Sequence, residues 1–169
     1  MGVGRSPNVE VGPGLVIRRA RGSDANPVAP MIAELAGDGV TNTDAARRFR
    51  RVVRAPSYSC YVLEQAETVV GVWVGRSGYL FATEAPAIQP VALVVSPEHR
   101  GQGFGGLLMH NCPFGNRHSQ NWFVTQHDHL HDYYQDLGWS PTGVRFVRHT
   151  EQRPQRSILE RAANKLLTR

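Results

Sequence analysis

The amino-acid sequence predicts an α+β fold in which a mixed sheet is flanked by helices. Runs of Val, Tyr and Trp that are typical of strands occur in groups, and stretches with helical spacing of apolar residues lie between these groups. The regular alternation of strand and helix that would predict parallel βαβ units is missing. With 169 residues the chain is long enough for one domain with its own core.

Capping residues and helix breakers mark the expected elements of the first half. Ser23 and Asp24 are expected to cap the first helix, and Thr43 and Asp44 the second. Residues 1–13, rich in Gly and Pro, are expected to form a loose segment. The elements that follow are a strand over 15–20, helices over 28–36 and 45–53, and strands over 58–64 and 68–75.

The second half adds further strands and helices. Expected are strands over 87–95, 122–126 and 144–149, and helices over 103–110, 130–137 and 158–167. The expected domain organisation is the loose segment 1–13, one domain over 14–150, and a C-terminal amphipathic helical tail over 151–169.

The charge pattern argues against a nucleic-acid-binding protein, although the net charge is +5. Of the 19 basic residues only Lys165 is a lysine, and such a skew is as typical of genomic codon bias as of a binding surface. The one dense basic cluster has helical spacing, which predicts a solvated helix face. This arginine cluster consists of Arg47, Arg48, Arg50, Arg51 and Arg54.

The sequence also predicts a cytoplasmic protein without a membrane partner. No apolar run approaches the roughly 18 residues that a membrane span needs. Residues 1–13 lack the apolar core of a signal peptide. Cys60 and Cys112 have no CxxC partner, which predicts two reduced thiols.

A glycine-rich turn after the strand over 87–95 is the most informative motif. The run Arg100-Gly-Gln-Gly-Phe-Gly-Gly106 opens the helix over 103–110. Glycines allow a ligand to approach the backbone closely, and the first N–H groups of a helix have no partner within it. With the helix dipole, such a turn is suited to binding a pyrophosphate.

Two other phosphate-binding motifs fit less well. Gly101 to Gly106 satisfies the dinucleotide pattern GxGxxG, but five residues, Ser96 to Arg100, separate it from the strand. A P-loop is excluded because no Lys-Ser/Thr pair follows the glycines.

The glycine-rich turn resembles motif A of the GNAT family of N-acetyltransferases, whose pattern is Arg/Gln-x-x-Gly-x-Gly/Ala. A second segment, Tyr133-Tyr-Gln-Asp-Leu-Gly-Trp139, is similar to the family's Phe-Tyr-x-x-Leu-Gly-Phe. Tyr134 occupies the position of the tyrosine that often acts as general acid toward the departing coenzyme A thiolate. The resemblance covers most of the chain, although only these two segments are specific.

The resemblance implies the GNAT acyl-CoA N-acyltransferase fold, with a mainly antiparallel sheet and splayed central strands. It implies acetyl-CoA as co-substrate, no metal, and direct transfer of the acetyl group to a primary amine. The implied pantetheine contacts are backbone groups of Leu93, Val94 and Val95. The implied pyrophosphate site consists of Arg100, Gly101, Gln102, Gly103, Phe104, Gly105 and Gly106.

The sequence departs from the family's pattern near the reacting amine. The strand over 87–95 lacks the carboxylate that often acts as general base, so solvent is favoured as the proton acceptor, with Glu84 or His127 as the alternative. His127 stands where an asparagine is common, and is a candidate base or pantetheine contact. His127, His129 and His131 are spaced by two, without the i,i+4 pair of a zinc helix, and no metal site is predicted.

The acceptor amine is expected to belong to a small molecule, a metabolite or an antibiotic, in a bacterial cytoplasm. Three alternatives stay open: acetylation of aminoacyl-tRNA, with the arginine cluster as docking surface, acetylation of a protein amine, and a non-catalytic acyl-CoA-binding module. The oligomeric state also stays open, a homodimer included.

Overall fold

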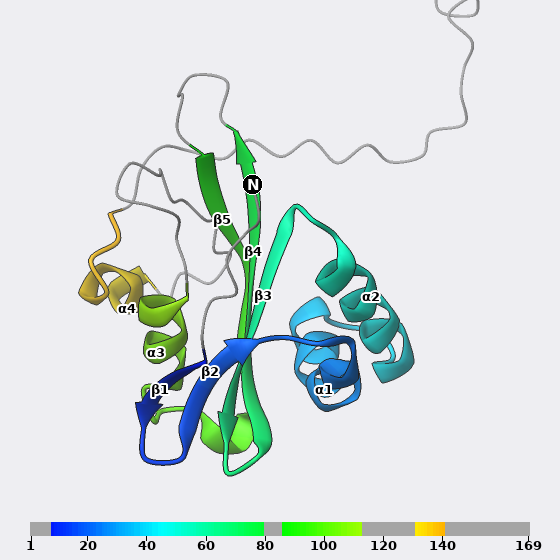
Figure 1. The fold of residues 1–169 in the computed structure, drawn as a ribbon, viewed down its shortest axis with the longest axis horizontal. Helices are drawn as coiled ribbons and strands as arrows, with labels where there is room; N and C mark the ends of the chain where they lie inside the picture. Colours follow the sequence, from blue (N-terminus) through cyan, green and yellow to red (C-terminus); the bar gives the residue numbers. More distant parts are fainter. Residues whose placement is uncertain (1–7, 80–85, 113–130, 141–169) are drawn as a thin grey trace, which may run out of the picture. The chain divides into compact units, whose positions relative to one another are not determined.

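The computed structural model describes residues 8–79, 86–112 and 131–140 of the chain. Within these ranges five strands form one antiparallel sheet, in the order β1-β2-β3-β4-β5 (Figure 1). The sheet is flanked by helices, which confirms the predicted α+β fold. The strands are β1 (Val9–Gly12), β2 (Leu15–Arg19), β3 (Tyr58–Gln65), β4 (Thr68–Tyr79) and β5 (Pro86–Val95). The helices are α1 (Ala25–Ala36), α2 (Asn42–Arg54), α3 (Phe104–Asn111) and α4 (His131–Asp136), with the short 3₁₀ helices η1 (Gly22–Asp24) and η2 (Pro97–His99).

Helix α4 belongs to a second compact unit that begins at residue 131 and is described by itself. The strands predicted over 122–126 and 144–149 and the helix predicted over 158–167 lie outside the described residues. None of the described helices has the length and apolar character of a membrane span.

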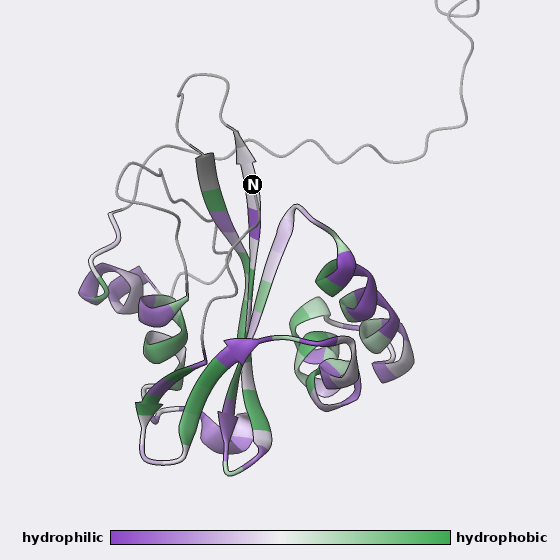
Figure 2. Cartoon of the chain, viewed as in Figure 1, coloured by the Kyte–Doolittle hydropathy of each residue, from purple (hydrophilic) through white to green (hydrophobic). Residues whose placement is uncertain are grey.

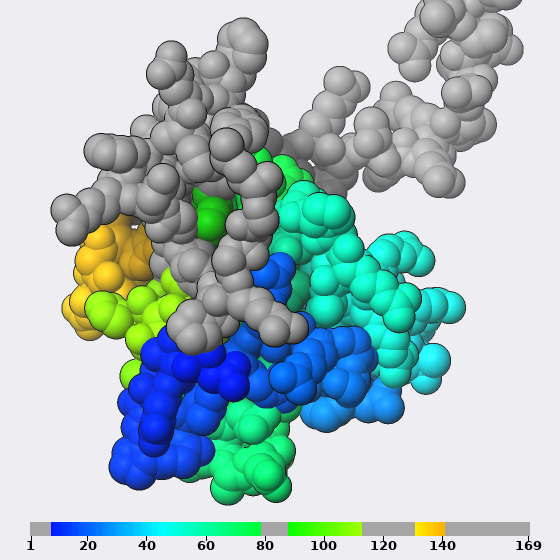
Figure 3. Space-filling view, viewed as in Figure 1, coloured from blue at the N-terminus to red at the C-terminus, as the bar shows by residue number. Residues whose placement is uncertain are grey.

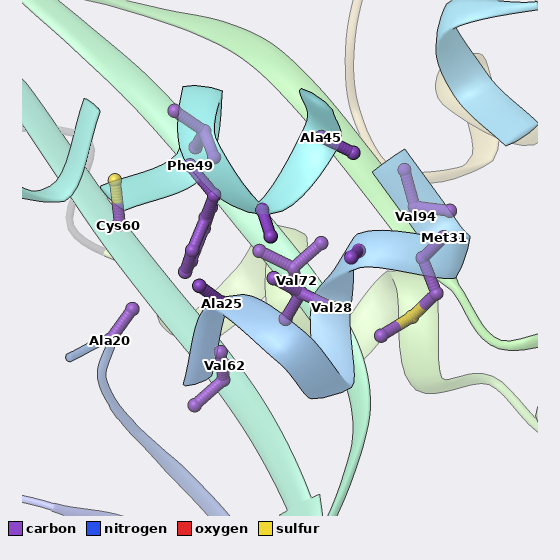
Figure 4. Packing of buried hydrophobic residues seen from close by; sticks show 13 residues of the cluster. Ala20, Ala25, Val28, Met31, Ala45, Phe49, Cys60, Val62, Val72 and Val94 are labelled. Atoms are coloured by element: carbon purple, nitrogen blue, oxygen red, sulfur yellow. The ribbon is translucent and has the colours of Figure 1, made fainter. Parts of the chain in front are cut away.

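Both faces of the sheet are covered, α1 and α2 lying on one side and α3 on the other (Figure 1). Alternate strand residues point to opposite faces, so that Val62 and Val72 share a core with Val28 of α1 and Phe49 of α2 (Figure 4). Helix α2 carries many hydrophilic residues, whereas the strands of the sheet include several hydrophobic stretches (Figure 2). Burying each such Val or Phe side chain contributes about 1.5–3 kcal/mol, which holds the helices on the sheet.

Two helix starts differ from the sequence prediction. Helix α2 is capped by Thr41, whose Oγ1 accepts a hydrogen bond of 3.1 Å from the backbone N–H of Asp44, and not by Thr43. Asp24 precedes α1 but makes no side-chain cap, because Arg18 and the N–H of Arg21 occupy its carboxylate.

Strand β1 lies within the segment predicted to be loose. Val9 pairs with Ile17 across a tight turn that contains Gly14. The strand is only four residues long, so its alternation of Val and Glu is a weak signal. Strand β4 also extends four residues beyond the predicted end at Gly75 and stays paired with β5 up to Tyr79. Cys60 and Cys112 are buried free thiols, as expected.

A buried ion cluster joins β2, β3 and the start of α1. The Arg18 guanidinium donates two hydrogen bonds of 2.9 Å to the Asp24 carboxylate, and its Nε donates one of 2.7 Å to Glu64. The side chains of Arg18 and Asp24 are only 14% and 8% exposed. Burial alone would raise the pKa of Asp24, but the hydrogen bonds from Arg18 and Arg21 outweigh it and lower that pKa.

Asp24→Asn is expected to lower the free energy of unfolding at pH 7 by about 3 kcal/mol, the low end for breaking a buried pair, because Glu64 still contacts Arg18. A carboxyl pKa lowered by folding stabilises the protein above the unfolded value of about 3.9. This contribution is lost as the pH falls through the folded pKa, so the two proteins should then converge. Urea unfolding of both at pH 7 and in acid measures this difference.

The control is Asp38→Asn, which removes one negative charge from an exposed turn and should leave the unfolding free energy unchanged. Equal stability of Asp24→Asn and the unaltered protein at pH 7 would contradict a stabilising role of the cluster.

Candidate active site

The end of β5 presents backbone groups along one edge. Val72 pairs with Val94, and the N–H of Ser96 donates a hydrogen bond of 2.9 Å to the carbonyl of Val70. In an antiparallel ladder alternate residues face the partner strand, so the even-numbered residues of β5 here face β4. The backbone groups of Leu93 and Val95 therefore point to the other edge, which has no neighbour among the described strands.

A short turn, η2, connects β5 to the glycines and is held by its own residues. The Ser96 hydroxyl is hydrogen-bonded to Nδ1 of His99 at 2.7 Å. The His99 ring stacks on Phe104, with 6.2 Å between the ring centroids. The backbone N–H of Arg100 donates to the carbonyl of Pro97 at 3.3 Å. These contacts fix the direction in which the chain enters the glycine run.

Gly101 and Gly103 turn the chain from η2 into α3. Their φ angles are 75° and 80°, in the left-handed region that residues with a Cβ rarely adopt. An added Cβ would meet no atom within 4 Å at either position, so the space beside the turn is open in the described part of the chain.

Residues 101–106 carry six consecutive backbone N–H groups for which the described residues offer no acceptor. The first helical bond runs from Leu107 N–H to the carbonyl of Gly103 at 3.1 Å. Gly103 occupies the N-cap position and has no side chain to cap the helix. Unpaired amides at the positive end of a helix dipole are suited to binding phosphate oxygens.

The polar side chains of this loop contact the protein. Arg100 donates to the Val95 carbonyl through Nε at 3.0 Å and to Glu34 of α1 through Nη2 at 2.7 Å. Gln102 donates to the carbonyl of Glu98 at 3.3 Å. The glycine motif predicts a role for Arg100 and Gln102, whereas no sequence signal indicates Glu34, which lies 66 residues from Arg100. The Ser96–His99 contact could have been predicted from the sequence, because the two residues are three positions apart across one turn.

The second unit contains Tyr134 on the short helix α4. The rings of Tyr133 and Tyr134 meet edge to face with 5.2 Å between their centroids. Burial raises the pKa of Tyr134, so its hydroxyl stays protonated. Gly138 follows with a φ of 83°. His127 lies outside the described residues.

The predicted absence of a metal site is tested only in part. Among the described residues no three His, Cys, Asp or Glu side chains come together. His127 and His129 of the histidine run are not among them. The absence of a metal therefore stays a prediction.

A comparison with known protein families identifies the family to which this fold and glycine turn belong. The family whose sequence model is described as an acetyltransferase (GNAT) domain matches residues 56–141, just over half of the chain. The chain belongs to the GNAT family. It is an acetyl-CoA-dependent N-acetyltransferase, as the resemblance of its glycine run implied. The matched GNAT segment contains β5, the glycine turn, α3 and α4.

Solved GNAT structures share the fold at low sequence identity. A possible acetyltransferase from Clostridium difficile 630 has a TM-score of 0.68 and 13% identity, covering 82% of this chain and 99% of its own. Glucosamine-6-phosphate N-acetyltransferase from Arabidopsis thaliana has a TM-score of 0.63 and 17% identity, covering 81% and 99%. The aminoglycoside N-acetyltransferase AAC(6')-Iy in complex with CoA has a TM-score of 0.64 and 15% identity, covering 85% and 99%. No curated protein matches the chain in sequence.

A matched pair of variants at Gly103 tests the anion site. Asn and Asp have the same shape and both tolerate the left-handed conformation, so they differ only in charge. Gly103→Asp is expected to weaken coenzyme A binding at least about 30-fold relative to Gly103→Asn, because a carboxylate near a phosphate costs about 2–4 kcal/mol at a protein surface. Calorimetry measures both dissociation constants.

Equal binding by the two folded Gly103 variants would remove the glycine turn from the site. NADH serves as the control ligand and is expected not to bind, since the turn lacks the position of a dinucleotide fingerprint.

Proposed function

We propose that this GNAT enzyme transfers the acetyl group of acetyl-CoA directly to a primary amine of a small molecule. One observation carries the proposal: the amides of residues 101–106 have no acceptor among the described residues and adjoin the open edge of β5. Turnover of acetyl-CoA with a panel of small amines tests it. Binding of acetyl-CoA without turnover of any amine would favour a non-catalytic acyl-CoA-binding module.

In this proposal the pyrophosphate contacts backbone rather than side chains. The amides of Gly101 to Gly106 bind the phosphate oxygens, while Arg100 and Gln102 hold the loop through the contacts described above. The pantetheine arm extends along the open edge of β5 and pairs with backbone groups of Leu93 and Val95. Val94 supports the strand, since its backbone faces β4 and its side chain is 7% exposed.

The reaction requires no covalent enzyme intermediate. The neutral amine attacks the thioester carbonyl, the C–N bond forms, the C–S bond breaks, and the sulfur receives a proton or a hydrogen bond from Tyr134. A thiol has an ordinary pKa near 8.5 and a phenol one near 10, so complete transfer of the Tyr134 proton is not strongly driven. Burial raises the pKa of Tyr134 further, which keeps the hydroxyl protonated. The amine loses its proton to solvent, with His127 as the alternative base.

The solved relatives support a small amine as acceptor. The names of two of them state that they act on glucosamine 6-phosphate and on aminoglycosides. Another aminoglycoside acetyltransferase, from an uncultured soil metagenomic sample, was crystallised with sisomicin. An amine on a sugar or a similarly polar small molecule is accordingly the first acceptor class to assay.

Acetylation of aminoacyl-tRNA is the second candidate, with the exposed arginine cluster as its docking surface. Arg48, Arg51 and Arg54 are exposed on α2, a helix that is visible in cyan in the space-filling view (Figure 3). Arg47 is exposed and pairs with Asp44, and Arg50 donates to Asn26 at 2.8 Å. Binding to charged tRNA that weakens steeply with salt would support this acceptor. Several other expectations stay predictions. They are a protein amine as acceptor, a homodimer, a bacterial and cytoplasmic origin, and a domain that extends from residue 14 to residue 150.

Tyr134→Phe tests the general acid. It is expected to lower kcat by about 10²–10⁴-fold, the usual value of general acid help, and to leave the affinity for acetyl-CoA nearly unchanged. Tyr133→Phe is the matched control, because it removes the hydroxyl from the neighbouring ring of the same helix, and it should keep kcat. Stopped-flow measurement of the chemical step gives the comparison. An unchanged rate in Tyr134→Phe would exclude this tyrosine from the chemistry.

A further inference from the structure

We propose that Glu34 is a positioning residue for acyl-CoA binding, acting through Arg100. Glu34 stands in the last turn of α1, remote in sequence from the glycine turn, and its carboxylate accepts the 2.7 Å hydrogen bond from Arg100 Nη2. The proposal rests on the proposed function, since it assumes that the glycine turn binds acetyl-CoA.

Arg100 connects three segments of the fold, two through its guanidinium and one through its backbone N–H. One branch reaches Glu34, and Nε reaches the carbonyl of Val95 at the end of β5. The backbone N–H of Arg100 is also fixed, by the carbonyl of Pro97. Arg100 directly precedes the six amides of residues 101–106, so its placement determines where those amides begin.

Glu34 is held in place by a buried helix. Val28 and Met31 on the inner face of α1 are 0% and 3% exposed, and the helix ends at Gly37 with a φ of 78°. The side chains of Glu34 and Arg100 are themselves 49% and 48% exposed. Pairs this exposed contribute little to folding stability, so the contact is better suited to holding the loop than to stabilising the fold.

A positioning role and simple electrostatics predict opposite changes in the affinity for coenzyme A when the Glu34 carboxylate is removed. Coenzyme A is a polyanion, so removal of a nearby negative charge by itself strengthens its binding. Loss of a positioning contact weakens binding instead, because the amides no longer meet the phosphates in the right geometry. The direction of the change therefore separates the two roles of Glu34.

Calorimetry with coenzyme A is the test. Glu34→Ala is expected to weaken binding about 2–5-fold, the range that an exposed ion pair can supply, and Glu34→Gln less, because an amide oxygen still accepts the hydrogen bond. Arg100→Lys should weaken it similarly, since one ammonium keeps the charge but cannot reach both Val95 and Glu34. The double variant Glu34→Ala/Arg100→Lys should bind coenzyme A as tightly as Arg100→Lys alone, because both substitutions remove the same contact. Asp38→Ala is the matched control and should leave binding unchanged or slightly tighter.

Kinetics give a second readout that a general loss of structure would not reproduce. Glu34→Ala should raise the KM for acetyl-CoA about 2–5-fold while keeping kcat and the thermal midpoint. Binding by Glu34→Ala as tight as that of the unaltered protein, or tighter, would overturn the positioning role. Failure of the unaltered protein to bind coenzyme A would instead overturn the proposed function, so the two failures are distinguishable.

Discussion

The left-handed turn at Gly101 and Gly103 is the constraint on which the rest of the site depends. It connects η2 to α3, so that α3 begins with N–H groups that have no acceptor among the residues that the structure describes. A residue with a Cβ disfavours this conformation by about 1–2 kcal/mol, which explains why glycine occupies both positions. In the proposed function, anion binding is then a property of the backbone, present before any ligand arrives.

The sheet and the helices hold this turn on a rigid support. The Leu108 side chain of α3 packs so closely on Gly71 that a Cβ there would lie 3.0 Å from Leu108 Cδ1. Phe104, the first residue of α3, is 6% exposed and stacks against His99. Arg100 joins the same turn to α1 on the opposite face of the sheet. Elements on both faces therefore determine one short loop, as a preorganised site requires.

Local patterns predicted most of the fold and the glycine turn. The turn is readable because its glycines, the strand before it and the helix after it are contiguous. Asp24 occupies the predicted N-cap position of α1, but its side chain does not cap the helix, because Arg18, a residue of the preceding strand, recruits its carboxylate. The contact of Glu34 with Arg100 was not predictable, because the two residues are distant in sequence and nothing near Glu34 in the sequence distinguishes it from other exposed helix residues. The roles of Tyr134 and His127 stay predictions, because they depend on residues from 113 onward that are described only in part.

The central claim is that coenzyme A binds to the backbone amides of the glycine turn. Amide nuclear magnetic resonance of ¹⁵N-labelled protein during titration with coenzyme A tests it most directly. The account predicts large shifts for the N–H signals of Gly101, Gly103, Gly105 and Gly106, and none for Gly14 in the β1–β2 turn. Saturable binding of coenzyme A that left these four glycine signals in place would contradict the account.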